Sequence, residues 1–154
     1  DLVTEARQAA EKKAREDALD EVVRRNLLDV PKCLVEDELE DYTGRVVRNL
    51  ARQGIDAAKT SINWKKLYEE ERPGAEQAVR RSLVLGAIAK QENLDVTDED
   101  LDAEFRRVAE ATNKSPMAVR AQFEKDRGVE SLRERLRQNK ALDFVYRNAN
   151  ISRG

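Results

Sequence analysis

Apolar residues recur every three or four positions between Pro31 and Gln53, a spacing that places their side chains on one face of an α-helix. Proline is favoured at the first helical position, so Pro31 predicts where this helix begins. Gly54 predicts its end, because glycine readily adopts the left-handed conformation that terminates helices. At about 1.5 Å per residue the helix is roughly 34 Å long. Its apolar stripe consists of Val35, Leu39, Tyr42, Val46 and Leu50.

Helical spacing also precedes this segment. Residues 2–28 carry a stripe made mostly of alanine, without a helix breaker. Such small side chains bury too little area to stabilise a lone helix, so we expect this helix to lie against another part of the protein or to connect domains. After Gly54, residues 55–63 mix apolar and turn-forming side chains, which predicts the tip of a helical hairpin.

A new helical period begins at Trp64. Pro73 interrupts it and predicts a kink or a fresh helix start, because proline lacks the N–H that a helix interior requires. Residues 83–89 are apolar on nearly every side, which predicts the most enclosed helix of the domain. Gly86 within that run predicts a close approach of another backbone.

The remaining helices are indicated by their start signals. Thr97 followed three residues later by Asp100 resembles a capping box, and Ser115-Pro116 repeats a start signal for a short helix that ends near Gly128. No segment alternates between apolar and polar residues, so the sequence predicts an all-α fold. The stripe of the last helix, which starts at Val129, consists of Leu132, Leu136, Leu142, Val145 and Ala149.

Composition favours thin helical hairpins over a thick core. Charged residues make up 39% of the 154 residues and aromatic residues only 5%, which suits helices with a narrow apolar stripe and a broad charged face. The net charge is −2 with both signs interleaved, so no bulk attraction to nucleic acid or to a membrane surface is expected.

Cysteine usage and the chain ends bear on location. A single cysteine, Cys33, excludes an internal disulfide and fits a reducing compartment. No apolar run is long enough to span a bilayer and no leader opens the chain, so we expect a cytoplasmic protein. The chain begins with Asp1 rather than methionine, so we expect it to be a piece of a longer protein.

Most catalytic and metal sites are excluded by residue type. The chain has no histidine, which rules out a serine triad, a cysteine–histidine pair and most zinc sites, and no glycine-rich phosphate loop occurs. The acidic residues at 95–102 lack the glycine of a calcium loop and predict helix capping instead. Three arginine pairs, at 24–25, 80–81 and 106–107, have acids within a turn or two and predict salt-bridged faces. We therefore expect neither an enzyme nor a cofactor.

Several short motifs occur in a fixed order along nearly the whole chain. They are Val30-Pro31 with Leu34-Val35-Glu36 and Glu38-Leu39; Arg80-Arg81-Ser82-Leu83-Val84-Leu85-Gly86 with Ile88 and Glu92-Asn93-Leu94; Val96-Thr97-Asp98-Glu99; Ser115-Pro116 with Val119; and Leu132 to Leu136 followed by Lys140-Ala141-Leu142-Asp143-Phe144. In this order and spacing they resemble the C-terminal chaperone domain of bacterial trigger factor.

This resemblance implies an elongated helical body whose two arms enclose a cradle, in a family that shelters nascent chains without nucleotide. By that comparison, residues 1–28 form a long connecting helix, 30–94 the first arm, 96–137 the second arm and 138–151 a helix that returns to the body. The uninterrupted arm helix of the family contrasts with the Pro73-Gly74 step of this sequence.

Two other parts of the family have no counterpart in this sequence. These are the ribosome-docking domain with its Gly-Phe-Arg-type loop and the prolyl-isomerase domain. The resemblance therefore assigns neither isomerase activity nor direct ribosome binding to these residues. A body segment that precedes the isomerase domain is also missing, so we expect some core surface to be exposed.

The leading hypothesis is a holdase whose apolar patches bind unfolded or nascent polypeptides. The residues predicted to bind clients are Tyr42, Val46, Leu50, Ile55 and Ile62 on the first arm, and Val108, Met117, Val119 and Phe123 on the second. Met117 is favoured because an unbranched thioether adapts to varied partners. One variant is the helical domain of periplasmic parvulin-type chaperones, which would require export. The rival is a structural docking or dimerisation module, in which self-association buries the same stripes.

Overall fold

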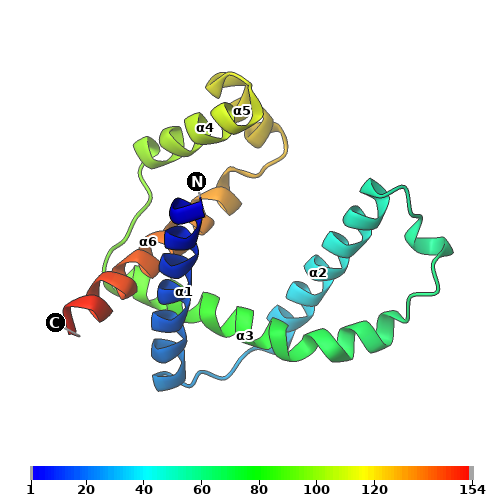
Figure 1. Cartoon of the computed structure of the whole chain (residues 1–154), viewed down its shortest axis with the longest axis horizontal. Helices are drawn as coiled ribbons and strands as arrows, with labels where there is room; N and C mark the ends of the chain where they lie inside the picture. Colours follow the sequence, from blue (N-terminus) through cyan, green and yellow to red (C-terminus); the bar gives the residue numbers. More distant parts are fainter. Residues whose placement is uncertain (1, 153–154) are drawn as a thin grey trace. The chain divides into compact units, whose positions relative to one another are not determined.

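All elements that the structure describes are helical, which confirms the predicted all-α class (Figure 1). The structure is a computed structural model and describes residues 2–152. In that range it has six α-helices and one short 3₁₀-helix. Their bounds are α1 Leu2–Arg25, α2 Lys32–Arg52, η1 Ala57–Lys59, α3 Trp64–Gln91, α4 Asp98–Thr112, α5 Pro116–Lys125 and α6 Val129–Ser152.

The chain forms two compact units, whose boundaries fall within α1, between Val22 and Val23, and within α3, between Leu83 and Val84. Of the described residues, the first unit comprises 2–22 and 84–152, and the second comprises 23–83. The predicted division at residues 28, 94 and 137 stays a prediction, because it follows the arms of the resemblance rather than compactness. Each unit has its own small apolar core.

The second unit is a hairpin of α2 and α3. Its core pairs Val35 and Leu39 of α2 with Ala75 and Val79 of α3, and Leu39 is only 1% exposed. Both pairs are spaced four residues apart, so each occupies a single helix face. The two helices diverge from this core towards η1 (Figure 1). Apolar side chains further along the stripe of α2 therefore have less protein to cover them.

The ends of α2 follow the sequence signals with one correction. Pro31 was predicted as the first helical residue, but it caps the helix with an extended ψ of 129° while α2 begins at Lys32. The Pro31 carbonyl still accepts the first helical hydrogen bonds, from Leu34 and Val35. At the other end Gly54 has φ of +74°, which confirms the left-handed residue predicted there.

Three predictions about α3 need correction. A fresh helix start at Pro73 is wrong, because α3 is continuous from Trp64 to Gln91 with Pro73 inside it, whereas the alternative of a kink there stays a prediction. Proline has no N–H to donate to the carbonyl four positions earlier, which therefore lacks its helical partner. Both Pro73 and Gly74 are exposed, so water can reach that carbonyl instead. The close backbone approach predicted at Gly86 is not found, because a Cβ built there meets nothing within 4 Å. The run around it is also one-sided, since Ala87 is exposed while Ala89 is buried.

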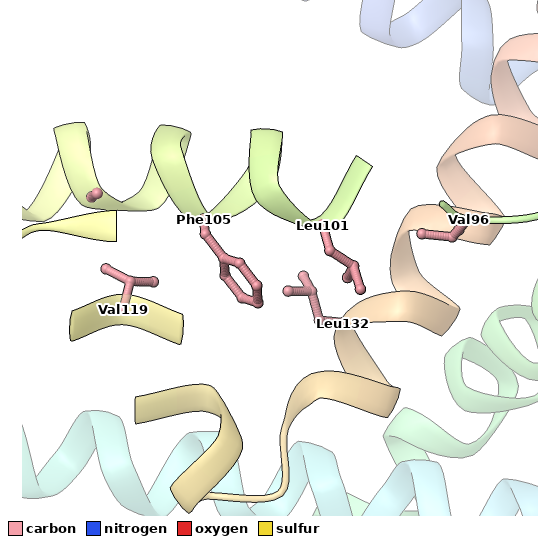
Figure 2. Packing of buried hydrophobic residues seen from close by; sticks show 6 residues of the cluster. Val96, Leu101, Phe105, Val119 and Leu132 are labelled. Carbon is pink, nitrogen blue, oxygen red and sulfur yellow. The ribbon is translucent and has the colours of Figure 1, made fainter. Parts of the chain in front are cut away.

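In the first unit α4, α5 and the start of α6 enclose the larger core. Figure 2 shows Leu101 and Phe105 pointing from α4 towards Leu132 and Val119. Val108, Phe123, Val129 and Leu136 are partly buried around this cluster. The helix starts are as predicted: Thr97 and Asp100 form a capping box, and the Ser115 hydroxyl accepts from the Ala118 N–H.

Polar contacts join α6 to the loop before α4 and to α1. Arg133 donates to the Val96 carbonyl at 2.7 Å, and Lys140 donates to the Asp95 carbonyl at 2.8 Å. Further along α6, Asp143 forms a salt bridge of 3.1 Å with Arg15 of α1. The Arg15 guanidinium also lies 5.1 Å from the ring centre of Tyr146. The alanine-rich α1 is thus attached to α6 through charge and aromatic contacts, as its weak stripe required.

Candidate functional site

The nine residues predicted to bind clients divide between the two units. Five lie in the second unit, where Ile55 is 39% exposed and the other four are half-buried. Those four are Tyr42, Val46, Leu50 and Ile62. All five lie on α2 or on the segment that joins α2 to α3, beyond the Leu39 core.

The four residues of the first unit have very different exposures. Met117 is 81% exposed, whereas Val119, two positions later, is only 4% exposed. Val108 and Phe123 are half-buried against the same core. Val119 is thus a core residue and offers no open surface, because it points into the space between α4, α5 and α6 (Figure 2).

One groove of the second unit surrounds Tyr42. It has a volume of about 260 Å³ and is lined by Glu38, Leu39, Tyr42, Arg45, Glu71, Gly74 and Ala75. The Arg45 guanidinium lies 5.8 Å from the ring centre of Tyr42. Partial burial, then the negative charge of Glu71 and a hydrogen bond to it, raise the pKa of the Tyr42 hydroxyl. This hydroxyl is therefore protonated at neutral pH.

A second groove of the same unit has acids on its rim and was not predicted. It has a volume of about 200 Å³, and its lining is Leu34, Asp37, Glu38, Asp41, Ala78, Val79, Ser82 and Leu83. Leu34 is 37% exposed. It precedes Val35 by one position and was not part of the predicted apolar stripe of α2. The one signal for it in the sequence is a leucine next to a dense acidic run.

The first unit has a groove around Met117, which we call the Met117 groove. Its volume is about 330 Å³ and it is lined by Asp102, Phe105, Arg106, Pro116, Met117 and Arg120. Apolar atoms come from both helices, since Phe105 belongs to α4 and Pro116 and Met117 form the first turn of α5. The arrangement is an open apolar surface with charged side chains at its edge.

The arginines of the Met117 groove differ in their partners. Arg120 pairs with Glu124 at 3.0 Å and with Asp102 at 3.4 Å. The hydrogen bond and charge of Glu124 are the main causes that raise the pKa of Arg120. Arg106 is exposed and has no hydrogen bond or ion pair within residues 2–152. Arg106 is therefore the cation of this groove whose charge is least compensated.

The acidic residues at 95–102 cap a helix, as predicted. Asp100 accepts from Lys140 at 2.6 Å and from the Thr97 N–H at 2.8 Å. The Lys140 hydrogen bond, followed by that of the Thr97 backbone, lowers the pKa of Asp100. In the described part of the chain no group of three or more acidic, cysteine or histidine side chains is arranged to hold a metal ion.

The neighbouring arginine pair is only partly a salt-bridged face. Glu104 accepts from Arg107 at 2.6 Å and from Arg135 at 2.8 Å. The Arg107 hydrogen bond is the largest cause that lowers the pKa of Glu104, while partial burial opposes it. Arg107 thus behaves as predicted, whereas Arg106 beside it does not.

None of the helices between residues 2 and 152 has both the length and the apolar character that crossing a bilayer demands.

Comparisons with known proteins agree with the helical architecture and the order of motifs. The family model described as the C-terminus of bacterial trigger factor protein matches residues 1–147. The trigger factor of Solibacter usitatus is 29% identical over 140 residues, which are 91% of this chain and 33% of the relative. That of Caldicellulosiruptor saccharolyticus is 32% identical over 149 residues, 92% of this chain and 34% of the relative. This chain thus spans about a third of the length of these curated relatives.

A solved structure shares the fold. It is described as domains of trigger factor from Thermotoga maritima and aligns with a TM-score of 0.63 at 20% identity, covering 89% of this chain and 81% of that one. The region matched by the family model is the C-terminus of trigger factor, which agrees with the expectation that this chain is not itself an enzyme.

Proposed function

Because this chain belongs to the family of the bacterial trigger factor C-terminus, we propose that it is an ATP-independent chaperone domain. It acts as a holdase that binds exposed apolar segments of unfolded or nascent polypeptides in the cytoplasm. In this proposal the residues of this chain do not contact the ribosome. Any such contact is made through another part of the protein.

The observation that carries the proposal is the exposure of Met117 beside a groove that two helices build. Met117 is 81% exposed, although Val119, two positions later on the same helix, is buried in the core of the first unit. A flexible thioether at such a place adapts to side chains of many shapes. In the second unit, Ile55 and the half-buried residues Tyr42, Val46, Leu50 and Ile62 supply further apolar surface.

The energetics favour several weak contacts over one tight site. Burying one client side chain contributes roughly 1.5–3 kcal/mol before the costs of ordering. Micromolar affinity requires about 8 kcal/mol, so a client must occupy several patches at once. Because each contact is weak, clients dissociate without any input of nucleotide energy. Val119 contributes indirectly by holding α5 in place.

The test is light scattering of an aggregating client protein in the presence of this chain. The chain should suppress aggregation at several-fold excess, and Met117→Ser and Ile55→Ser should each weaken client binding by about three- to tenfold. Leu27→Ser is a matched control, because Leu27 is 84% exposed and lines none of the grooves described above. Absence of suppression by the unaltered chain would refute the proposal.

The rival function is a structural module that docks or dimerises through the same apolar residues. Sedimentation at graded protein concentration separates the two. A tight dimer that ignores unfolded peptide would favour the rival. A monomer, or a weak dimer that peptide dissociates, is the result expected of a holdase.

A further inference from the structure

Of the charged groups that line the Met117 groove, some already have an ion-pair partner within the protein and one does not. This difference affects which client segments the groove binds. The groove has one carboxylate, Asp102, and two guanidinium groups, those of Arg106 and Arg120. Asp102 is already paired with Arg120. Arg106 is left as a cation without a partner among the described residues. A ligand that brings a negative charge therefore meets an open partner, and a ligand that brings a positive charge does not.

From this geometry we infer that the Met117 groove prefers apolar side chains that have an aspartate or glutamate next to them in the client sequence. The inference rests on the proposed function and specifies its substrate class at one site. The apolar side chain lies against Met117 and Pro116, which line the groove together with the buried Phe105. The neighbouring carboxylate lies within reach of Arg106, because Arg106 lines the same groove.

Two features add to this preference. The groove includes Pro116 and Met117 in the first turn of α5, where the helix dipole places partial positive charge. Arg106 also follows Asp102 by four residues, and these are neighbouring positions on a helix surface, yet no ion pair joins them. Asp102 is instead paired across the hairpin with Arg120, 18 residues away. Arg106 can therefore bind a client carboxylate without breaking an ion pair within the protein.

The experiment measures binding of three labelled peptides by fluorescence anisotropy. All three carry the same leucine and phenylalanine core, and they differ only in flanking residues: aspartate, asparagine or lysine. At about 0.05 M salt the aspartate peptide should bind about two- to fivefold more tightly than the asparagine peptide, and the lysine peptide should bind most weakly. At about 0.5 M salt the difference should shrink, since exposed charges are then screened.

Two substitutions locate the effect. Arg106→Gln should abolish the preference for aspartate, so that the aspartate and asparagine peptides bind with equal affinity to this variant. Lys114→Gln removes the same charge from the loop between α4 and α5, outside the groove, and should keep the preference. Arg106 is exposed and unpaired, so the unfolding transition of Arg106→Gln should match that of the unaltered chain. Met117→Ser should weaken the binding of all three peptides by the same factor.

The possible failures are distinguishable. If all peptides bind equally, or if Arg106→Gln keeps the preference, the inference is wrong while the holdase function stands. If the lysine peptide binds most tightly, the inference is likewise overturned. If no peptide binds at all, both the inference and the proposed function are refuted.

Discussion

The ring of Phe123 in α5 lies 5.6 Å from the ring of Phe105 in α4, measured between centroids, with the ring planes inclined by 52°. This tilted arrangement is a favourable geometry for two aromatic rings. It joins α4 and α5 close to the core of the first unit, where Phe105 is 3% exposed. The Met117 groove lies on the outside of the same hairpin, so its shape depends on this pair.

We therefore predict opposite outcomes for truncation of two lining residues of the Met117 groove. Phe105→Ala should lower the free energy of unfolding by about 3–5 kcal/mol, because it removes a buried aromatic side chain and leaves a cavity. Met117→Ala should change it by no more than about 0.5 kcal/mol, since Met117 is 81% exposed. Urea unfolding followed by far-UV circular dichroism measures both. Equal losses in the two variants would show that Met117 is not the surface residue described here.

The second prediction concerns two glycines in different backbone conformations. Gly86→Ala should raise the free energy of unfolding by about 0.5–1 kcal/mol, because Gly86 lies inside α3 and a Cβ there meets nothing within 4 Å. Gly54→Ala should lower it by about 1 kcal/mol, because φ at Gly54 is +74° and L-residues with a Cβ are strained there. Thermal unfolding of the two variants measures the direction of each change in stability. Destabilisation by Gly86→Ala would mean that the helix is covered at that position.

The third prediction is a pH dependence that originates at Asp100. Its pKa is lowered in the folded state from an ordinary value of 3.8, mainly by the Lys140 hydrogen bond. A carboxylate with a depressed folded pKa stabilises the fold above its unfolded pKa, and this contribution is lost as the pH falls through the folded value. Stability should therefore decrease as the pH falls through 3.8 and below.

Two variants test whether the pH dependence of stability originates at Asp100. Asp100→Asn and Lys140→Gln should each be less stable than the unaltered chain at neutral pH, and each should lose less stability on acidification. The double variant should lose less stability than the sum of the two single losses, because the two groups act on each other across a distance of 2.6 Å. Urea unfolding at a series of pH values measures the slopes. Parallel curves for all four proteins would place the pH dependence elsewhere.

The sequence determined those features that depend on a few neighbouring residues. The capping box of Thr97 and Asp100, the start at Ser115 and the left-handed Gly54 all involve groups within about four positions of one another, so local chemistry sufficed to predict them. The helical class followed in the same way from the spacing of apolar residues. At Pro73 the predicted alternative of a fresh helix start was wrong, since α3 continues through this exposed residue.

Tertiary packing alone decided which apolar residues stay open. Met117 and Val119 are both apolar and two positions apart on one short helix, and both were predicted to bind clients. Val119 is buried because Leu132 and Phe105, which are distant in sequence, close over it, while nothing covers Met117. The same long-range packing pairs Glu104 of α4 with Arg135 of α6 and Asp102 of α4 with Arg120 of α5, whereas Arg106 has no ion pair within residues 2–152. Burial and pairing depend on residues brought together by the fold, and these contacts have no signal in the local sequence.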